Sequence, residues 1–168
     1  LKATLDYKEA VANSDVSFVC VGTPSLPNGS INLAYIFQVV KQIAEGLKTK
    51  SNFHTVVIRS TVKAGTLKAC KEIIEDISGK KHDIDFGVVS NPEFLREGTA
   101  MLDFEKPPYT IIGTEASKSK EVMTALYKNI DAPIYYLKPE EAEMIKYANN
   151  NFHAMKITFA NEIGNICI

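Results

Sequence analysis

No apolar stretch of the sequence approaches the ~20 residues that a membrane-spanning helix needs. Charge of one sign is not in excess either, because 19 Lys and Arg stand against 20 Asp and Glu, giving a net charge of −1. A nearly neutral chain offers no electrostatic reason to bind nucleic acid or an anionic membrane. We therefore expect neither partner, and any ligand must be held by local chemistry.

Cysteine is scarce, with three positions at Cys20, Cys70 and Cys167. An odd number without C-x-x-C spacing argues against a disulfide framework, and the three histidines are too far apart to form a metal-binding pattern. We expect no metal and a reducing, cytoplasmic compartment. Cys20 and Cys70 lie in apolar runs and are interpreted as small buried hydrophobic residues.

Glycine signatures for binding phosphate are missing. None of the nine glycines forms a G-x-G, so the chain has no dinucleotide fingerprint and no P-loop, and it has no G-x-S-x-G nucleophile turn. The chain begins Leu1-Lys2-Ala3, without an initiator methionine, a signal peptide or a transit peptide. We expect it to be part of a longer protein.

Apolar β-branched runs alternate with helical patterns along the chain. The length of 168 residues, with 45% apolar and 23% charged residues, suits one globular domain or a domain with an appendage. The alternation predicts an α/β domain with a mainly parallel sheet. Near-continuous hydrophobicity places Val16–Val21 and Thr55–Ile58 at the centre of that sheet. The expected strands are Val16–Val21, His54–Arg59, Phe86–Ser90, Tyr109–Gly113 and Pro133–Leu137, with a weaker strand at Lys2–Leu5.

Four helices are predicted from apolar residues that recur with helical period. The last has nearly thirty residues, roughly 40 Å in length, and is too long to cover only its own sheet. Its apolar stripe predicts contact with another domain or subunit, and we expect a homodimer through this helix. The four helices are Leu33–Lys48 after the N-cap Asn32, a helix from the cap Thr66 to Ile77, Ser117–Asn129, and Glu140 to about Cys167.

Polar residues follow three of the expected strands. Thr23-Pro24 follows the first, Ser60-Thr61 the second and Asn91-Pro92-Glu93 the third. The carboxyl ends of parallel strands share one edge of a sheet, and ligands bind in the crevice outside that edge. The sequence therefore predicts one ligand site to which these three loops converge.

The third loop has the pattern of a helix start. Asn91 suits an N-cap and Pro92 the first helical position, so we expect a helix over Glu93–Glu97. Spacing of four would then place Glu93 and Glu97 on one face as a carboxylate pair. Acidic residues also favour helix N-termini through the helix dipole, so the pattern leaves a catalytic and a structural explanation open.

The long helix carries a second polar cluster. Lys146 and Asn150 are four residues apart, as are Asn149 and His153. A Lys at a ligand site needs an anion or developing negative charge, and a buried Asn must be hydrogen-bonded. A solvated helix face explains the same spacing, and the spacing alone leaves both explanations open.

Several motifs together resemble the UDP-glucose/GDP-mannose dehydrogenase family, in order and spacing, over essentially the whole chain. Segments such as His153–Asn165 are more similar to the GDP-mannose branch than to the UDP-glucose branch. The motifs are Thr4–Tyr7, Val19–Pro24, Arg59–Val62, Ser90–Gly98 (S-N-P-E-F-L-R-E-G) and Ala142–Asn150 (A-E-M-I-K-Y-A-N-N).

The resemblance implies a partial Rossmann-like, mainly parallel sheet with flanking helices that ends in a long connecting helix. Residues 1–138 would be the carboxyl-side part of the NAD-binding domain, and residues 139–168 the start of a long central helix for linkage and dimerisation. The Gly-rich turn would lie upstream of Leu1 and the nucleophilic cysteine downstream of Ile168, because Cys167 is too close behind Lys146. The chain alone would then be inactive and bind NAD poorly.

The family oxidises the C6 alcohol of a nucleotide sugar to a carboxylate with two NAD, through an aldehyde and a cysteine-bound thioester. The resemblance implies GDP-mannose as substrate, with UDP-glucose or a UDP-HexNAc sugar as the alternative. A non-catalytic binding or dimerisation module is an alternative of another class. A hydroxyacid-type dehydrogenase would share the α/β core but does not account for N-P-E-F-L-R-E.

The resemblance also implies a set of cofactor contacts. Thr23 and Pro24 would line the NAD site, and Ser60 and Thr61 would lie near the nicotinamide. Thr61 would also hold the hydrolytic water.

Catalytic roles are implied for three further residues. Glu93 would be the carboxylate that handles protons and manages the hydrolytic water. Lys146 would stabilise the developing alkoxide, and Asn150 would share that oxygen; one such preorganised donor is typically worth ~10²–10³ in rate.

Sugar contacts are implied on both segments. Glu97 would lie between the nicotinamide and the sugar. The remaining implied substrate contacts are the backbone of Phe94, Leu95 and Arg96, together with His153 and Asn161.

Overall fold

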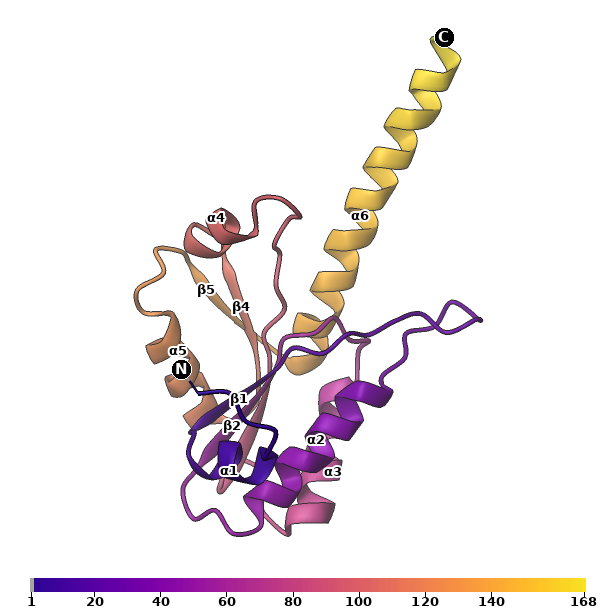
Figure 1. Cartoon of the computed structure of the whole chain (residues 1–168). Coiled ribbons are helices and arrows are strands. Elements are labelled where there is room, and N and C mark those ends of the chain that lie inside the picture. Colours follow the sequence, from indigo (N-terminus) through magenta and orange to yellow (C-terminus); the bar gives the residue numbers. More distant parts are fainter. Residues whose placement is uncertain (1) are drawn as a thin grey trace.

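The computed structural model describes residues 2–168 and contains one five-stranded sheet in the order β1-β2-β3-β4-β5 (Figure 1). Strands β1, β2 and β3 are parallel, β4 is antiparallel to β3, and β5 is parallel to β4. The predicted α/β class with a mainly parallel sheet is confirmed. The bounds are β1 Val16–Val19, β2 His54–Ile58, β3 Phe86–Ser90, β4 Thr110–Gly113 and β5 Ile134–Leu137.

Six helices accompany the sheet within residues 2–168, and four of them are the predicted ones. The other two, α1 and α4, are short helices that the sequence reading missed. Their bounds are α1 Tyr7–Ala12, α2 Ala34–Leu47, α3 Thr66–Ser78, α4 Ala100–Glu105, α5 Ser117–Tyr127 and α6 Pro139–Ile166.

The weak strand predicted at Lys2–Leu5 is wrong, because the described residues of this segment pair with no strand. Asp6 caps the helix that follows: its carboxylate accepts hydrogen bonds from the backbone N–H of Lys8 at 2.9 Å and of Glu9 at 3.0 Å. A strong N-cap signal thus outweighs the short apolar pattern that precedes it.

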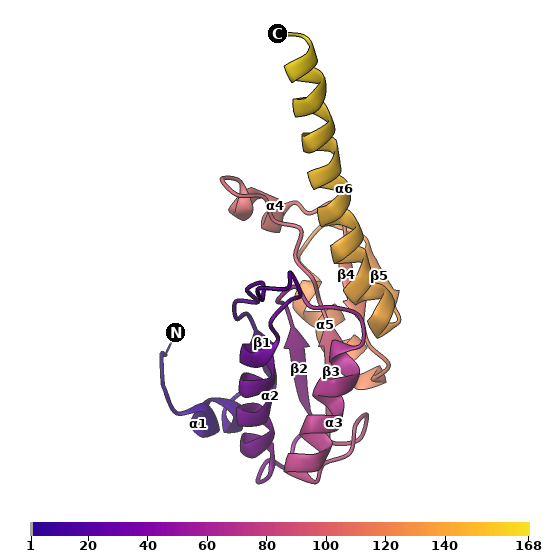
Figure 2. The same cartoon turned by 90° about the vertical axis from the view of Figure 1, so that its right-hand side faces the viewer.

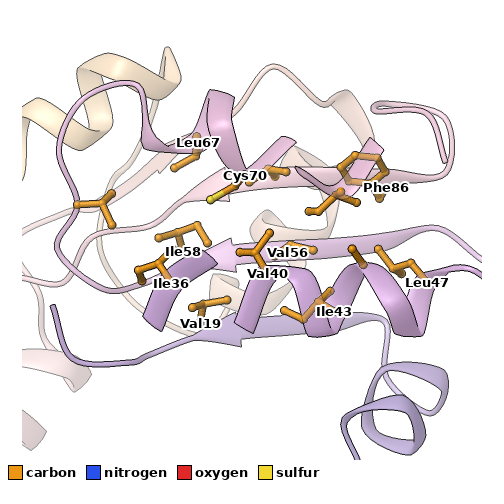
Figure 3. Close-up of a cluster of buried hydrophobic side chains, with 14 of the residues drawn as sticks. Val19, Ile36, Val40, Ile43, Leu47, Val56, Ile58, Leu67, Cys70 and Phe86 are labelled. Atoms are coloured by element: carbon orange, nitrogen blue, oxygen red, sulfur yellow. The ribbon is translucent and has the colours of Figure 1, made fainter. Parts of the chain in front are cut away.

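The core lies on both faces of the central strands. Helices α2 and α3 cover one face of the sheet and α5 the other (Figure 2). In Figure 3, Ile36 and Val40 of α2 lie over Val56 and Ile58 of β2. On the opposite face a smaller cluster gathers around Met123 of α5. Burial on both faces explains why β2 is apolar at successive positions and confirms its predicted central place.

Strand β1 corrects two predictions. We expected Val16–Val21 to be a central strand and Cys20 to be buried, but β1 ends at Val19 and forms an edge of the described sheet. Phe18 is 44% exposed, and Cys20 just beyond the strand is exposed as well. An apolar sequence shows that a strand is suited to burial, but its side chains are covered only where neighbouring elements are present. Cys70, by contrast, is fully buried as predicted.

Helix α6 has 28 residues and projects away from the sheet (Figures 1 and 2). The predicted long final helix is confirmed. Its first turns pack on β4 so closely that a Cβ on Gly113 would lie 2.3 Å from the Cβ of Ala142. Every residue from 148 onward is exposed. Among residues 2–168, no helix combines the length and apolar character needed to cross a membrane.

Candidate active site

A groove of about 810 Å³ lies between the loop that follows β3 and helix α6. Its volume is in the range of small-molecule sites. Seven of the eight residues predicted to contact substrate line it, and the eighth, Asn161, is exposed farther along α6 and does not. The seven are Phe94, Leu95, Arg96, Glu97, Lys146, Asn150 and His153.

The loop itself corrects a prediction, because no helix forms over Glu93–Glu97 and α4 begins only at Ala100. Asn91 is fully buried and does not act as an N-cap. Its amide donates to the carbonyl oxygen of Ile111 at 2.8 Å, and its Oδ1 accepts from Arg59 at 2.8 Å. The hydroxyl of Tyr127 donates to the same oxygen at 2.6 Å. The Asn91 side chain, which we expected to start a helix, therefore joins the loop to Arg59 at the end of β2, to β4 and to α5.

Without a helix, Glu93 and Glu97 are not the one-face pair that we expected. The carboxylate of Glu93 accepts a hydrogen bond from the backbone N–H of Leu95 at 2.7 Å. Its other oxygen lies 3.0 Å from the Nζ of Lys146, which also donates to the backbone carbonyl of Glu93. Two residues 53 positions apart in the sequence therefore meet beside the groove.

Lys146 is enclosed where it meets Glu93, with its side chain only 7% exposed. Its Nζ also lies 5.3 Å from the ring centroid of Phe94, within the range of a cation–π contact. Asn150, one turn farther along the helix, is exposed on the groove wall. The arrangement places an ammonium group and an amide on the groove wall, and the ammonium contacts the carboxylate of Glu93, which does not itself line the groove.

Asp103 holds the opposite wall and was missed by the sequence reading. It bonds Arg96 through the guanidinium at 2.7 Å and through the backbone N–H at 2.9 Å, and it accepts from the hydroxyl of Thr99 at 2.9 Å. The hydrogen bonds from Arg96 hold the pKa of Asp103 well below its usual range. These bonds fix the loop, but no periodic signal in the sequence links residues 96 and 103.

The predicted cofactor residues lie at the carboxyl ends of β1 and β2. The hydroxyl of Ser60 donates to the carbonyl oxygen of Val21 at 2.7 Å, which ties the loop after β2 to the loop that carries Thr23 and Pro24. Thr23 and Thr61 are partly exposed, so their hydroxyls remain accessible to a ligand. None of the predicted residues Thr23, Pro24, Ser60 and Thr61 lines the groove, whereas Glu97 does.

Family models match most of the chain. Residues 1–131 match the NAD binding domain of the UDP-glucose/GDP-mannose dehydrogenase family, and residues 140–168 match the central domain of the same family. The chain is 52% identical over 167 residues to a GDP-mannose 6-dehydrogenase of Pseudomonas aeruginosa and 43% identical over 173 residues to a UDP-glucose 6-dehydrogenase of Rhizobium meliloti. It covers 38% of the length of each of these relatives.

Solved structures give the same result. A ternary complex of GDP-mannose dehydrogenase from Pseudomonas aeruginosa superposes with a TM-score of 0.94 at 52% identity, over 97% of this chain and 38% of that one. A UDP-glucose dehydrogenase from Pyrobaculum islandicum gives a TM-score of 0.90 at 41% identity, over 96% of this chain and 37% of that one. The expected fold class and the expected cofactor, NAD, are confirmed. The chain belongs to the UDP-glucose/GDP-mannose dehydrogenase family, and its residues 1–131 correspond to that family's NAD binding domain.

Proposed function

We propose that this chain is part of an NAD-dependent nucleotide-sugar 6-dehydrogenase that oxidises the sugar C6 alcohol to a carboxylate. The observation that carries the proposal is the contact of Lys146, on the groove wall, with Glu93. Because the chain spans 38% of the length of its relatives, this activity belongs to a longer protein. The chain by itself is expected to be inactive.

Lys146 and Asn150 meet the charge that develops on the C6 oxygen. As the O–H proton of the alcohol passes to Glu93, the carboxylate that handles protons, negative charge grows on that oxygen before the hydride leaves C6. The ammonium of Lys146 is held in place before this charge appears. A fixed donor in an enclosed site stabilises such charge more than water does. Asn150, on the next turn of α6, donates its amide to the same oxygen. NAD, when bound, supplies the hydride acceptor.

Glu93 and Thr61 serve the hydrolytic half of the reaction. A thioester at C6 requires water, and Glu93 removes a proton from that water while the Thr61 hydroxyl orients it. The cysteine that carries the thioester is none of Cys20, Cys70 and Cys167; it lies downstream of residue 168. Glu93 contacts Lys146 and is partly exposed, so a water molecule can reach its carboxylate.

The sugar is held by the loop. Backbone groups of Phe94, Leu95 and Arg96 contact its hydroxyls, and Glu97 lies between sugar and nicotinamide. His153 extends the same contact along α6. Asn161 reaches the substrate only if the nucleotide sugar follows the helix beyond the groove.

GDP-mannose, oxidised to GDP-mannuronate, is the substrate that we propose. Support comes from the higher identity to a GDP-mannose 6-dehydrogenase, 52%, than to a UDP-glucose 6-dehydrogenase, 43%. UDP-glucose is the second candidate, favoured by the structural similarity to a UDP-glucose dehydrogenase at a TM-score of 0.90. Turnover of the full-length protein with each nucleotide sugar distinguishes them.

The distal half of α6 is proposed to join two copies of the protein. Large apolar side chains are exposed there, including Phe152 at 57% and Phe159 at 67%. Exposed apolar residues at helical spacing indicate a helix that packs against a partner. We place this assembly in the cytoplasm, consistent with three cysteines that form no disulfide among residues 2–168.

The experiment that tests the proposal is Lys146→Ala in the full-length protein. We expect kcat to fall by about 10²–10³-fold with the fold unchanged, because one preorganised donor contributes about that much. Lys128→Ala, an exposed lysine remote from the groove, is the control and should keep wild-type turnover. Normal turnover of the Lys146 variant would remove the assignment.

A further inference from the structure

Helix α6 is attached to the sheet domain by three buried residues near its start, Ala142, Glu143 and Lys146. Ala142 packs against Gly113, and Lys146 faces Glu93. Glu143 has no part in the proposed reaction, yet it is only 2% exposed. Burying a carboxylate is costly unless hydrogen bonds compensate for lost water, so the contacts of Glu143 define its role.

Glu143 accepts two short hydrogen bonds from the first turn of a different helix. The backbone N–H of Gly65 donates to its Oε2 at 2.7 Å, and the backbone N–H of Leu67 donates to its Oε1 at 2.7 Å. Helix α3 begins here and has no side-chain cap of its own. The carboxylate therefore satisfies N–H groups that would otherwise lack partners, at the positive end of the helix dipole.

Burial and hydrogen bonding have opposite effects on the ionisation of the Glu143 carboxyl group. Burial raises the pKa of Glu143, and the backbone donors of Leu67 and Gly65 lower it. Both oxygens of the carboxylate are used by separate donors, so the side chain is held at two points rather than one. A group bound in this way fixes the backbone from which it extends.

The position of Glu143 on α6 gives this attachment its consequence. Lys146 is three positions after Glu143, so the two lie on neighbouring turns of one side of the helix. Fixing Glu143 against α3 and Ala142 against Gly113 sets both the rotation of α6 about its axis and its position along that axis. In this orientation of α6, the side chain of Lys146 contacts Glu93.

We propose that Glu143 is a positioning residue: by tying the N-terminal part of α6 to the start of α3, it holds the Lys146 ammonium on the groove wall, against Glu93. This inference rests on the proposed function of Lys146. It assigns to Glu143 an effect on turnover that a cap serving only helix stability would not have.

The test is Glu143→Gln in the full-length protein. A glutamine can accept only one of the two hydrogen bonds and sets an N–H against the other donor. We expect kcat to fall by about 10–100-fold, because a displacement of ~1 Å can cost up to ~10² in rate. The KM for the nucleotide sugar should rise by a smaller factor than kcat falls, because the loop that contacts the sugar is unchanged and only the contacts from α6 move with Lys146.

Glu141→Gln is the matched control on the same turn. Glu141 accepts a hydrogen bond from the backbone N–H of Lys138 at 2.9 Å and is exposed. A glutamine can still accept that bond, so this variant makes the same chemical change without touching α3. We expect this variant to keep wild-type kcat. Wild-type kcat in Glu143→Gln, or an equal loss in the two variants, would overturn the proposal.

Chemical labelling gives a readout that does not depend on turnover. Acylation by an amine-reactive ester, followed by mass spectrometry, should modify Lys146 slowly in the wild type and several-fold faster in Glu143→Gln, because the displaced side chain leaves its enclosed position. Lys50, which donates to the carbonyl oxygens of Val11 and Ser14, should label at the same rate in both proteins. Unchanged protection of Lys146 would sink the inference.

Two outcomes remain distinguishable. If Lys146→Ala keeps full turnover, the proposed function fails, whereas the labelling still reports whether Glu143 positions the lysine. If Glu143→Gln does not fold, Glu143→Asp retains the charge on a side chain one methylene shorter. That variant should show an intermediate loss of kcat and an intermediate rate of labelling; wild-type values for both would overturn the inference.

Discussion

The two halves of α6 differ in how much of their surface is packed against the rest of the domain. The first half is packed on the sheet and holds three buried residues, whereas from residue 148 to the end every side chain is exposed. No break, proline or glycine separates them before Gly164. A single helix therefore presents a buried lysine beside Glu93 near one end and exposed apolar side chains toward the other.

The largest change in stability is expected from a substitution under the packed half of α6. Gly113→Ala introduces a Cβ that would lie 2.3 Å from that of Ala142 and 3.2 Å from a backbone oxygen. We expect the free energy of unfolding to fall by about 3 kcal/mol, because neither neighbour can withdraw without moving α6. Urea denaturation measures this change.

Gly164→Ala is its counterpart in the exposed half. Nothing lies within 4 Å of the added Cβ, and the residue is helical. Alanine there should favour the helix by about 0.5–1 kcal/mol. Equal destabilisation by both substitutions would show that the distal half is packed too, and the contrast would fail.

Acid is expected to destabilise the sheet on which the packed half of α6 lies. His54 is fully buried in β2, and burial together with the charge of Lys50 lowers its pKa to about 4, so it is neutral at pH 7. The unfolded chain binds this proton near pH 6.5 and the folded protein only near pH 4, so stability falls as the pH drops through that window. Between pH 7 and pH 5 the expected loss is about 2 kcal/mol.

Denaturation at the two pH values, in wild type and His54→Gln, checks this prediction. The glutamine variant has no proton to gain at this position, so most of the pH dependence should disappear. Its stability at pH 7 can be lower without affecting the comparison, because only the difference between the two pH values counts. An undiminished difference would assign the acid sensitivity to other groups.

A further prediction concerns self-association through the exposed half. Phe159→Asp places a charge among apolar side chains and should weaken self-association about tenfold, ~1.4 kcal/mol. Sedimentation equilibrium measures the dissociation constant. Asn151→Asp, on an exposed polar position of the same half, should leave it unchanged. A monomer at high concentration in the wild type would contradict the proposed dimer.

Sequence patterns predicted the elements that present a continuous apolar face to the core. Strand β2 and helices α2 and α3 follow directly from apolar periodicity, because each faces the core along its whole length. Strand β1 was misplaced because its composition cannot report which neighbours are present. Helix α4, with no buried residue, leaves no periodic signal at all.

The candidate site was predicted through resemblance more than through pattern. Spacing alone suggested a helical carboxylate pair at Glu93 and Glu97, and the loop is not helical. Its shape depends on Asn91, whose amide group is engaged by β2, β4 and α5, and on Asp103, which binds Arg96. Contacts between segments so distant in sequence are a property of the assembled fold.

The separation of 53 residues between Glu93 and Lys146 also governs when the site comes into being. The intervening chain contains β4, α5 and β5, so the groove closes only after the antiparallel part of the sheet has been added. A partly folded chain offers no complete pocket. A ligand of the groove therefore binds only the folded state, and by mass action it shifts the folding equilibrium toward that state.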